Sequence, residues 1–135
     1  MRTCGDCSAC CTWLEQNAYG HTSGKGKSCG FLSNGKCSIY EIRPKVCSFY
    51  ECAWKQNLLP DWMKPNECGI IVSVLNNGEI QYLDIIETDR PLQKYIKDAI
   101  EQFCTEHNCG ARYIDQKNNK ISFFGPPEFL ALFNV

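Results

Sequence analysis

Residues 4–11 read CGDCSACC and place four cysteines within eight positions of the chain. Two residues separate Cys4 from Cys7 and Cys7 from Cys10, so a backbone that coils around one point brings these three sulfur atoms together. Gly5, Ser8 and Ala9 are small, and they leave backbone N–H groups free to hydrogen-bond thiolate sulfur or inorganic sulfide. This stretch predicts a thiolate-ligated metal centre around which the first half of the chain folds.

The last two cysteines of this stretch, Cys10 and Cys11, are adjacent. Neighbouring Cα atoms lie only about 3.8 Å apart, and neighbouring side chains commonly diverge, so we expect the two thiols to serve different centres. The alternative is a vicinal disulfide, which is strained and would remove two thiols from the best-spaced ligand group.

Four further cysteines follow at longer spacings and extend the set of candidate metal ligands to eight. The eight are Cys4, Cys7, Cys10, Cys11, Cys29, Cys37, Cys47 and Cys52. Eight thiolates suit two four-coordinate sites, or one cluster with the remaining thiols around it, and the spacing leaves the pairing open. We expect bound metal to provide folding free energy that this half of the chain does not gain from apolar burial.

The sequence around the later cysteines carries a family resemblance. It reads CGFL from residue 29, GKCSIYEIRPKVC from residue 35 and FYECAW from residue 49. Together with CGDCSACC, this order resembles the YkgJ-type cysteine-cluster family, a zinc- or iron-chelating domain. The resemblance spans residues 4–54 and implies that all eight cysteines are metal ligands, with Arg43 and Pro44 at the family's Arg-Pro positions.

The same family includes flagellin lysine methylases, in which a similar cysteine region is implicated in holding an iron-sulfur cluster. The resemblance therefore implies iron-sulfur ahead of zinc. This chain has no recognisable Gly-rich adenosylmethionine-binding segment, which speaks against methyltransferase activity, and no complete catalytic constellation is visible.

Cysteine abundance bears on the cellular compartment. The chain has eleven cysteines among 135 residues, a density typical of proteins stapled by metal or by disulfides. Its first cysteine comes at position 4, where an export signal would have a charged and then an apolar segment. We therefore expect a cytoplasmic protein with reduced, metal-binding thiols. A disulfide framework is the alternative if a signal segment has been trimmed.

Charge and hydropathy limit the classes of partner. Fourteen Lys and Arg residues nearly balance fifteen Asp and Glu residues, and no dense basic run with interleaved aromatics occurs. The longest apolar stretches, such as residues 69–75, are far shorter than the roughly 18 residues that span a bilayer. We expect no nucleic acid and no membrane as partner, and an unidentified protein partner stays open.

The second half of the chain predicts regular structure. Residues 69–75 and 79–86 are rich in β-branched and aromatic residues and flank an Asn-Gly turn, which indicates a hairpin. Asp89 and Pro91 suit the start of a helix that continues to about His107. Residues 111–115 and 120–124 predict a second hairpin that turns through 116–119. The order is ββαββ.

We therefore expect one compact α+β domain over residues 1–135. A metal-stapled, irregular cysteine-cluster lobe, residues 1–68, would pack on a ββαββ lobe, residues 69–135. Within the first lobe we expect short helices near residues 12–16 and 44–54. Residues 19–28, rich in Gly and Ser, predict a flexible connector rather than a phosphate-binding loop.

Three cysteines and one histidine lie outside the family motif, namely Cys68, Cys104, His107 and Cys109. Their residue types and spacing permit a second tetrahedral site. The alternative that we favour is that Cys104 is a buried thiol on the apolar face of the helix and that His107 complements the helix C-terminus.

The first functional hypothesis is an intracellular iron-sulfur protein. Cys4, Cys7 and Cys10 would hold a [4Fe-4S] cluster together with Cys47 or Cys52, for electron transfer, sensing or as an accessory to a modifying enzyme. The alternative is a Zn²⁺-binding structural or interaction module with closed Cys4 sites. The first hypothesis predicts a brown, oxygen-sensitive protein, and the second predicts a colourless, chelator-sensitive one.

Overall fold

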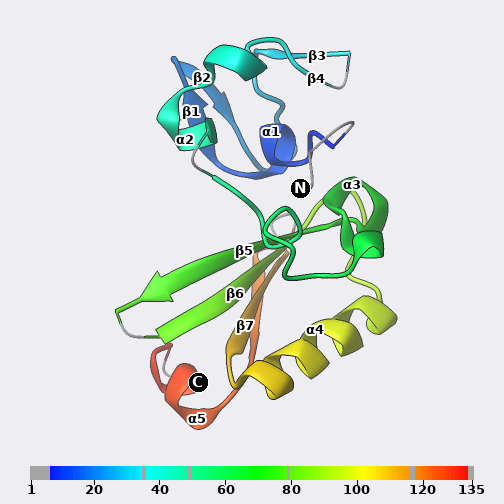
Figure 1. The fold of residues 1–135 in the computed structure, drawn as a ribbon, viewed down its shortest axis with the longest axis vertical. Helices are drawn as coiled ribbons and strands as arrows, with labels where there is room; N and C mark the ends of the chain where they lie inside the picture. Colours follow the sequence, from blue (N-terminus) through cyan, green and yellow to red (C-terminus); the bar gives the residue numbers. More distant parts are fainter. Residues whose placement is uncertain (1–6, 35, 49, 79, 116–117, 134–135) are drawn as a thin grey trace.

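The computed structural model describes residues 7–34, 36–48, 50–78, 80–115 and 118–133. A cysteine-rich lobe sits on one end of a larger lobe built from a four-stranded sheet (Figure 1). The protein is thus a small α+β structure, as the sequence predicts at this coarse level.

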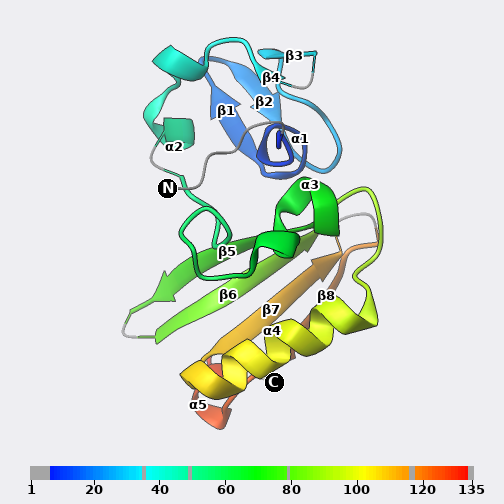
Figure 2. The same ribbon diagram turned by 45° about the vertical axis from the view of Figure 1, so that its right-hand side comes forward.

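The sheet consists of β5 (Ile70–Asn77), β6 (Ile80–Glu87), β7 (Gly110–Asp115) and β8 (Lys120–Phe124), in the order β5-β6-β7-β8. The outer pairs are antiparallel hairpins, whereas β6 and β7 are parallel. A parallel pair needs a crossover connection, and α4 (Lys94–His107) provides it across one face of the sheet (Figure 2). The predicted order ββαββ is confirmed.

The main core lies between α4 and the sheet. Alternate residues of the strands face the helix, which follows from the two-residue period of a strand. The core cluster includes Ile70, Val72, Leu83, Ile85, Ile96, Ile100, Cys104 and Ala111. On the other face, α5 (Pro127–Ala131) places Phe129 at 1% exposure against Tyr82 and Phe123.

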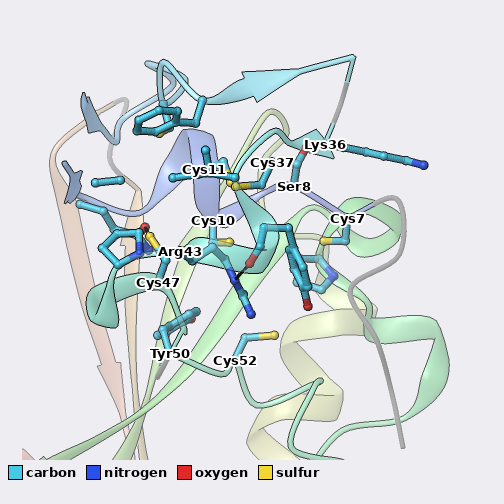
Figure 3. A pocket seen from close by; sticks show the side chains of 18 of the residues that line it. Cys7, Ser8, Cys10, Cys11, Lys36, Cys37, Arg43, Cys47, Tyr50 and Cys52 are labelled. Atoms are coloured by element: carbon cyan, nitrogen blue, oxygen red, sulfur yellow. Dashed lines mark hydrogen bonds between the residues drawn. The ribbon is translucent and has the colours of Figure 1, made fainter. Parts of the chain in front are cut away.

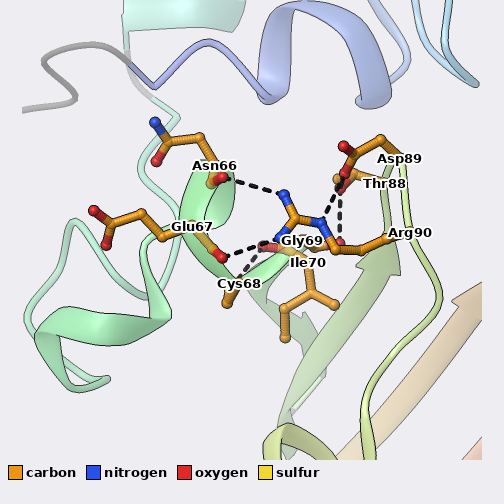
Figure 4. A network of polar contacts seen from close by, with 8 residues as sticks. All are labelled: Asn66, Glu67, Cys68, Gly69, Ile70, Thr88, Asp89 and Arg90. Carbon is orange, nitrogen blue, oxygen red and sulfur yellow. Dashed lines mark hydrogen bonds and ion pairs between the residues drawn. The ribbon is translucent and has the colours of Figure 1, made fainter.

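The helix begins later than the sequence predicts. Its N-cap is Gln93, whereas the sequence predicts a start at Asp89 and Pro91. The reason is a tertiary contact: Arg90 donates hydrogen bonds to the carbonyl oxygens of Glu67 (3.2 Å) and Asn66 (3.4 Å) (Figure 4). These carbonyls belong to α3 (Pro65–Cys68), so the segment before α4 is held at the end of α3 and starts no helix there.

The same network involves the segment between β6 and the helix. The Thr88 hydroxyl donates to the Gly69 carbonyl at 2.7 Å, and Asp89 accepts from Arg90 at 3.2 Å (Figure 4).

At its C-terminal end, α4 stops at His107 as predicted, because Asn108 adopts the left-handed conformation with φ of 50°.

The cysteine-rich lobe contains short elements: α1 (Cys10–Trp13), β1 (Gln16–Ala18), β2 (His21–Ser23), β3 (Leu32–Ser33), β4 (Lys36–Cys37), η1 (Tyr40–Ile42) and α2 (Lys45–Ser48). The following η2 (Asp61–Met63) packs on α3, and Met63 belongs to the core of the sheet lobe. The helices expected near residues 12–16 and 44–54 correspond to α1 and α2, which are each shorter than predicted. The prediction of a plain connector over residues 19–28 is wrong, because β2 lies inside it and pairs with β1. The turn between them is stabilised by the Gly20 N–H, which donates to Asn17 Oδ1 at 2.8 Å.

The two lobes meet where the chain passes from the cysteine-rich lobe to the sheet. The Ala53 N–H donates to the Val72 carbonyl of β5 at 2.6 Å, and the Tyr50 hydroxyl lies 2.7 Å from Ser73 Oγ. The segment around Cys52 is therefore fixed along β5. Among the described residues, no helix has both the length and the apolar character that crossing a membrane requires.

Candidate metal centre

A cavity of about 610 Å³ is lined by seven of the eight predicted ligands (Figure 3). They are Cys7, Cys10, Cys11, Cys29, Cys37, Cys47 and Cys52. The eighth, Cys4, lies outside the described residues. Ile71 of β5 and Pro65 of α3 also line this cavity, so it reaches the sheet lobe.

Short local elements place the thiols around this cavity. Cys10 and Cys11 occupy the first turn of α1, Cys37 ends β4 and Cys47 lies on α2. The Cys29 N–H donates to the Cys11 carbonyl at 2.7 Å, which ties these two segments together. Each thiol is half-buried, so the cavity shields the sulfur atoms only in part.

Other thiols of the cavity affect the ionisation of Cys47. Its Sγ donates to Gln16 Oε1 at 3.3 Å. Burial raises the pKa of Cys47, and the negative charges of Cys11, Cys29 and Cys37 raise it further. Such mutual repulsion is relieved when a metal cation binds, because thiolates are then the favoured form.

The ionised thiolate form of Cys11 is favoured even without metal. A hydrogen bond from Cys10 lowers the pKa of Cys11 to about 7, against the opposing effect of burial. The charge of Arg43 acts in the same direction as the hydrogen bond. Near neutral pH this thiol is therefore partly ionised, which is the form that binds metals.

Cys10 and Cys52 lie near Tyr50 on another side of the cavity. Burial raises the pKa of the Tyr50 hydroxyl, and the thiolate charges of Cys52 and Cys10 raise it further. The Ser73 hydroxyl acts in the opposite direction through its hydrogen bond. The neutral phenol is thus the form present at physiological pH.

Arg43 supplies positive charge to the cavity. Its guanidinium lies 3.8 Å from the centre of the Tyr40 ring, and its Nε donates to the Tyr40 carbonyl at 2.9 Å. Lys36 also lines the cavity but extends away from the thiols (Figure 3), and Lys55 pairs with Glu51 at 3.4 Å. None of the described lining residues is Asp or Glu.

The donor set fits a thiolate-ligated centre. Soft thiolates select zinc or iron-sulfur clusters, and the hard metals that prefer carboxylates find no such ligand here. Among the described residues, no three His, Cys, Asp or Glu side chains converge closely enough to hold a single ion. Four sulfurs at about 2.3 Å from zinc must approach one another to about 3.8 Å, so closing such a site requires the thiols to move inward.

No three of the four residues outside the family motif converge in the described part of the chain, although Cys104 and Cys109 share a side-chain hydrogen bond. The Cys68 Sγ donates to the Met63 carbonyl at 3.2 Å, and burial raises the pKa of Cys104 to about 12. His107 is exposed and stacks on Phe103 with ring centres 4.2 Å apart. Buried neutral thiols of this kind pack as core residues.

Among the lining residues that the sequence does not identify, Gln16 and Tyr50 form side-chain hydrogen bonds at the cavity. The position of Tyr50 two residues before Cys52 was a usable signal, because a chain segment that carries a ligand also carries its neighbours. Nothing local to Gln16 indicates its contact with Cys47, which depends on the packing of α2 against β1.

Comparison of the chain with models of known protein families, with curated proteins and with solved structures finds no match. The function is therefore inferred from the residues of the cavity.

Proposed function

We propose that the protein binds an iron-sulfur cluster of the [4Fe-4S] type in this cavity. The observation that carries the proposal is the gathering of seven thiols around one space that also contains Arg43 and no carboxylate among its described lining residues. All-cysteine ligation is the usual way in which proteins hold such clusters. A volume of about 610 Å³ also offers more room than a single ion needs.

The ligands in this proposal are Cys7, Cys10 and Cys52, together with Cys4. The spacing of residues 4–10 supports the first three cysteines of the chain as one ligand run. The shared influence of Cys10 and Cys52 on Tyr50 supports Cys52 as the remote ligand. Cys47 is the weaker candidate, because its thiol neighbours are Cys11, Cys29 and Cys37.

The surrounding residues have distinct tasks in this proposal. Arg43 offsets the negative charge that thiolates and sulfide bring into the cavity. Tyr50 and Ile71 cover the cavity on the side of the sheet and limit access of water, which affects the reduction potential. When bound, such a cluster supplies one-electron redox chemistry.

The role of the protein is then electron transfer, sensing, or assistance to a modifying enzyme in a reducing compartment such as the cytoplasm. Half-buried ligands support each of these roles, since the centre lies near enough to the surface to exchange electrons with a protein partner.

A second candidate is a zinc-binding structural or interaction module. The grouping of Cys11, Cys29 and Cys37 around Cys47 favours it, because four thiolates are the usual ligand set of a closed structural zinc site. In this candidate both sets of four cysteines hold Zn²⁺ and the protein is redox-silent.

Metal analysis of protein purified without oxygen tests the proposal. Iron and acid-labile sulfide in equal amounts, with broad visible absorption, are the expected result. Cys7→Ser removes both, whereas the matched control Cys109→Ser, which lies outside the cavity, retains them. Zinc as the sole metal, without colour, would replace this proposal with the zinc module.

A further inference from the structure

Two cysteines outside the metal cavity, Cys104 and Cys109, lie against each other where α4 passes into β7. Their side chains share a hydrogen bond. Both are free thiols, and both pack in the core between α4 and the sheet. Figure 1 shows that α4 ends near α5, away from the cysteine-rich lobe. The pair is therefore separate from the candidate metal centre, and neither thiol lines its cavity.

The end of α4 brings the two thiols together. In a continued helix, residues five positions apart would point about 140° away from each other around the axis. Here Asn108 adopts the left-handed conformation with φ of 50°, and the chain turns back over the last turn of the helix. The Cys109 N–H donates to the Cys104 carbonyl at 3.0 Å, as in the Schellman motif. That motif often has an apolar contact between these two positions, and in this protein both positions are thiols.

The two thiols differ in their access to solvent and in their ionisation. Cys104 is 1% exposed, whereas Cys109 is half-buried. Burial raises the pKa of Cys109, and the hydrogen bond with Cys104 offsets part of that rise. Burial, and next the negative charge of Cys109, raise the pKa of Cys104 to about 12. Cys109 is therefore the thiol of the pair that ionises first and the one that an oxidant in solution reaches.

The contact suits a disulfide rather than a metal site. A metal ion would need further ligands, and among the described residues no three His, Cys, Asp or Glu side chains converge. A disulfide needs two thiols alone, and these sulfur atoms would approach from hydrogen-bonding distance to about 2.05 Å.

We infer that Cys104 and Cys109 form a reversible intramolecular disulfide when the protein meets a hydroperoxide, and that Cys109 is the thiol that reacts first. The Cys109 thiolate attacks one oxygen of the peroxide bond and becomes a sulfenic acid, and the departing hydroxide or alkoxide takes up the proton that Cys109 released. The Cys104 sulfur then attacks the sulfenic sulfur, so that the S–S bond forms and water leaves with the proton of Cys104.

This reaction oxidises two thiols by two electrons in total and reduces one peroxide bond. In a reducing compartment, thiol–disulfide exchange returns the pair to two thiols. The inference goes beyond the proposed function, because it holds whichever metal the cavity binds.

Peptide mapping of the full-length, metal-loaded protein tests the inference. No Lys or Arg lies between Lys97 and Arg112, so trypsin releases residues 98–112 as one peptide whose only cysteines are Cys104 and Cys109. Protein purified without oxygen is treated with a small excess of hydrogen peroxide, denatured, alkylated with iodoacetamide and digested. The expected peptide has no alkyl group and is two hydrogen atoms lighter than the dithiol form. Reduction with dithiothreitol before alkylation should restore two alkyl groups.

The same digest gives the results that would overturn the inference. They are two alkyl groups on peptide 98–112 after peroxide treatment, or a disulfide from this peptide to another one. Cys68 is the internal control, because it is buried and donates to the Met63 carbonyl at 3.2 Å, and it should stay reduced. Oxidation of Cys68 to the same extent would mean that peroxide attacks buried thiols in general, and this too overturns the inference.

Two variants test the order of reaction. Cys104→Ala is expected to stop at a sulfenic acid on Cys109, which dimedone labels. Cys109→Ser should leave Cys104 reduced and unlabelled. Both variants should keep the metal content of the unmodified protein, because neither residue lines the cavity. Labelling of Cys104 in the second variant, without labelling of Cys109 in the first, overturns the assigned order. If either variant does not fold, the peptide from the unmodified chain decides whether the disulfide forms.

Discussion

The Tyr50 hydroxyl lies 2.7 Å from the Oγ of Ser73, and this contact joins the cysteine-rich lobe to the sheet. Ser73 pairs with Asp84 across β5 and β6, and Asp84 Oδ1 accepts from Arg112 Nε at 2.7 Å. A line of polar groups therefore runs from the edge of the thiol cavity across three strands. Ser73 and Asp84 are both buried, so each polar group depends on its neighbours for hydrogen bonds.

Tyr50→Phe is expected to lower the free energy of unfolding by about 1 kcal/mol, because the Ser73 hydroxyl loses its partner. Urea denaturation of the metal-loaded protein measures this. A double-mutant cycle with Ser73→Ala should show strong non-additivity, since both changes break one contact. Tyr95→Phe is the matched control, because Tyr95 is 58% exposed. Additive losses would mean that the two hydroxyls act independently.

Arg43→Gln is expected to raise the pH at which acid releases the metal by roughly half a unit. The charge of Arg43 lowers the pKa of Cys11 and of Cys47, so protons compete with the metal at higher pH once that charge is gone. Metal release followed against pH with a chromogenic chelator gives the midpoint. Lys36→Gln removes the same charge from a side chain that extends away from the thiols, and its midpoint should hardly change. Equal shifts in the two variants would contradict a specific role for Arg43.

Gly110→Ala is expected to destabilise the sheet lobe by about 2 kcal/mol, because a Cβ at this position would overlap the ring of Phe129. Thermal unfolding measures the change. Adding Phe129→Leu to this variant should recover part of the loss, since the smaller side chain makes room. The metal content should not change, because neither residue lines the cavity. No recovery in the double variant would argue against this close contact.

Removal of metal by a chelator is expected to abolish amide protection in residues 7–48 and to leave α4 and the central strands protected. The first region has a single fully buried hydrophobic side chain among those described, whereas α4 buries Ile96, Ile100 and Cys104 against the sheet. Hydrogen exchange with mass spectrometry compares the regions in one experiment. Equal protection of both regions after complete removal of the metal would show that the cysteine-rich lobe is stable without bound metal.

The sequence predicts the sheet lobe better than the cysteine-rich lobe for a physical reason. The β5–β6 hairpin follows from local signals, namely β-branched runs and a glycine, Gly78, with φ of 66° at the turn. The sequence predicts too early a start for α4, because Arg90 is held by carbonyls of α3 that are distant in sequence. Tertiary contacts of this kind leave no local pattern.

Composition and spacing identify cysteine as the candidate ligand, but they do not show which cysteines lie together. The sequence selects eight cysteines, and seven of them line one cavity. The neighbours of each thiol depend on how α1, the β3–β4 hairpin and α2 pack together. These elements are too short to predict. The β1–β2 hairpin was missed for the same reason, as each strand has only three residues.

The hydrogen bond between Ala53 and Val72 holds the segment that carries Cys52 against β5. In the proposed ligand set, the position of Cys52 therefore depends on β5 being in place in the sheet. A nascent or damaged chain without a formed sheet offers residues 4–10 alone, an incomplete ligand set that releases its metal readily. In the proposed ligand set, retention of the metal would then report whether β5 is in place.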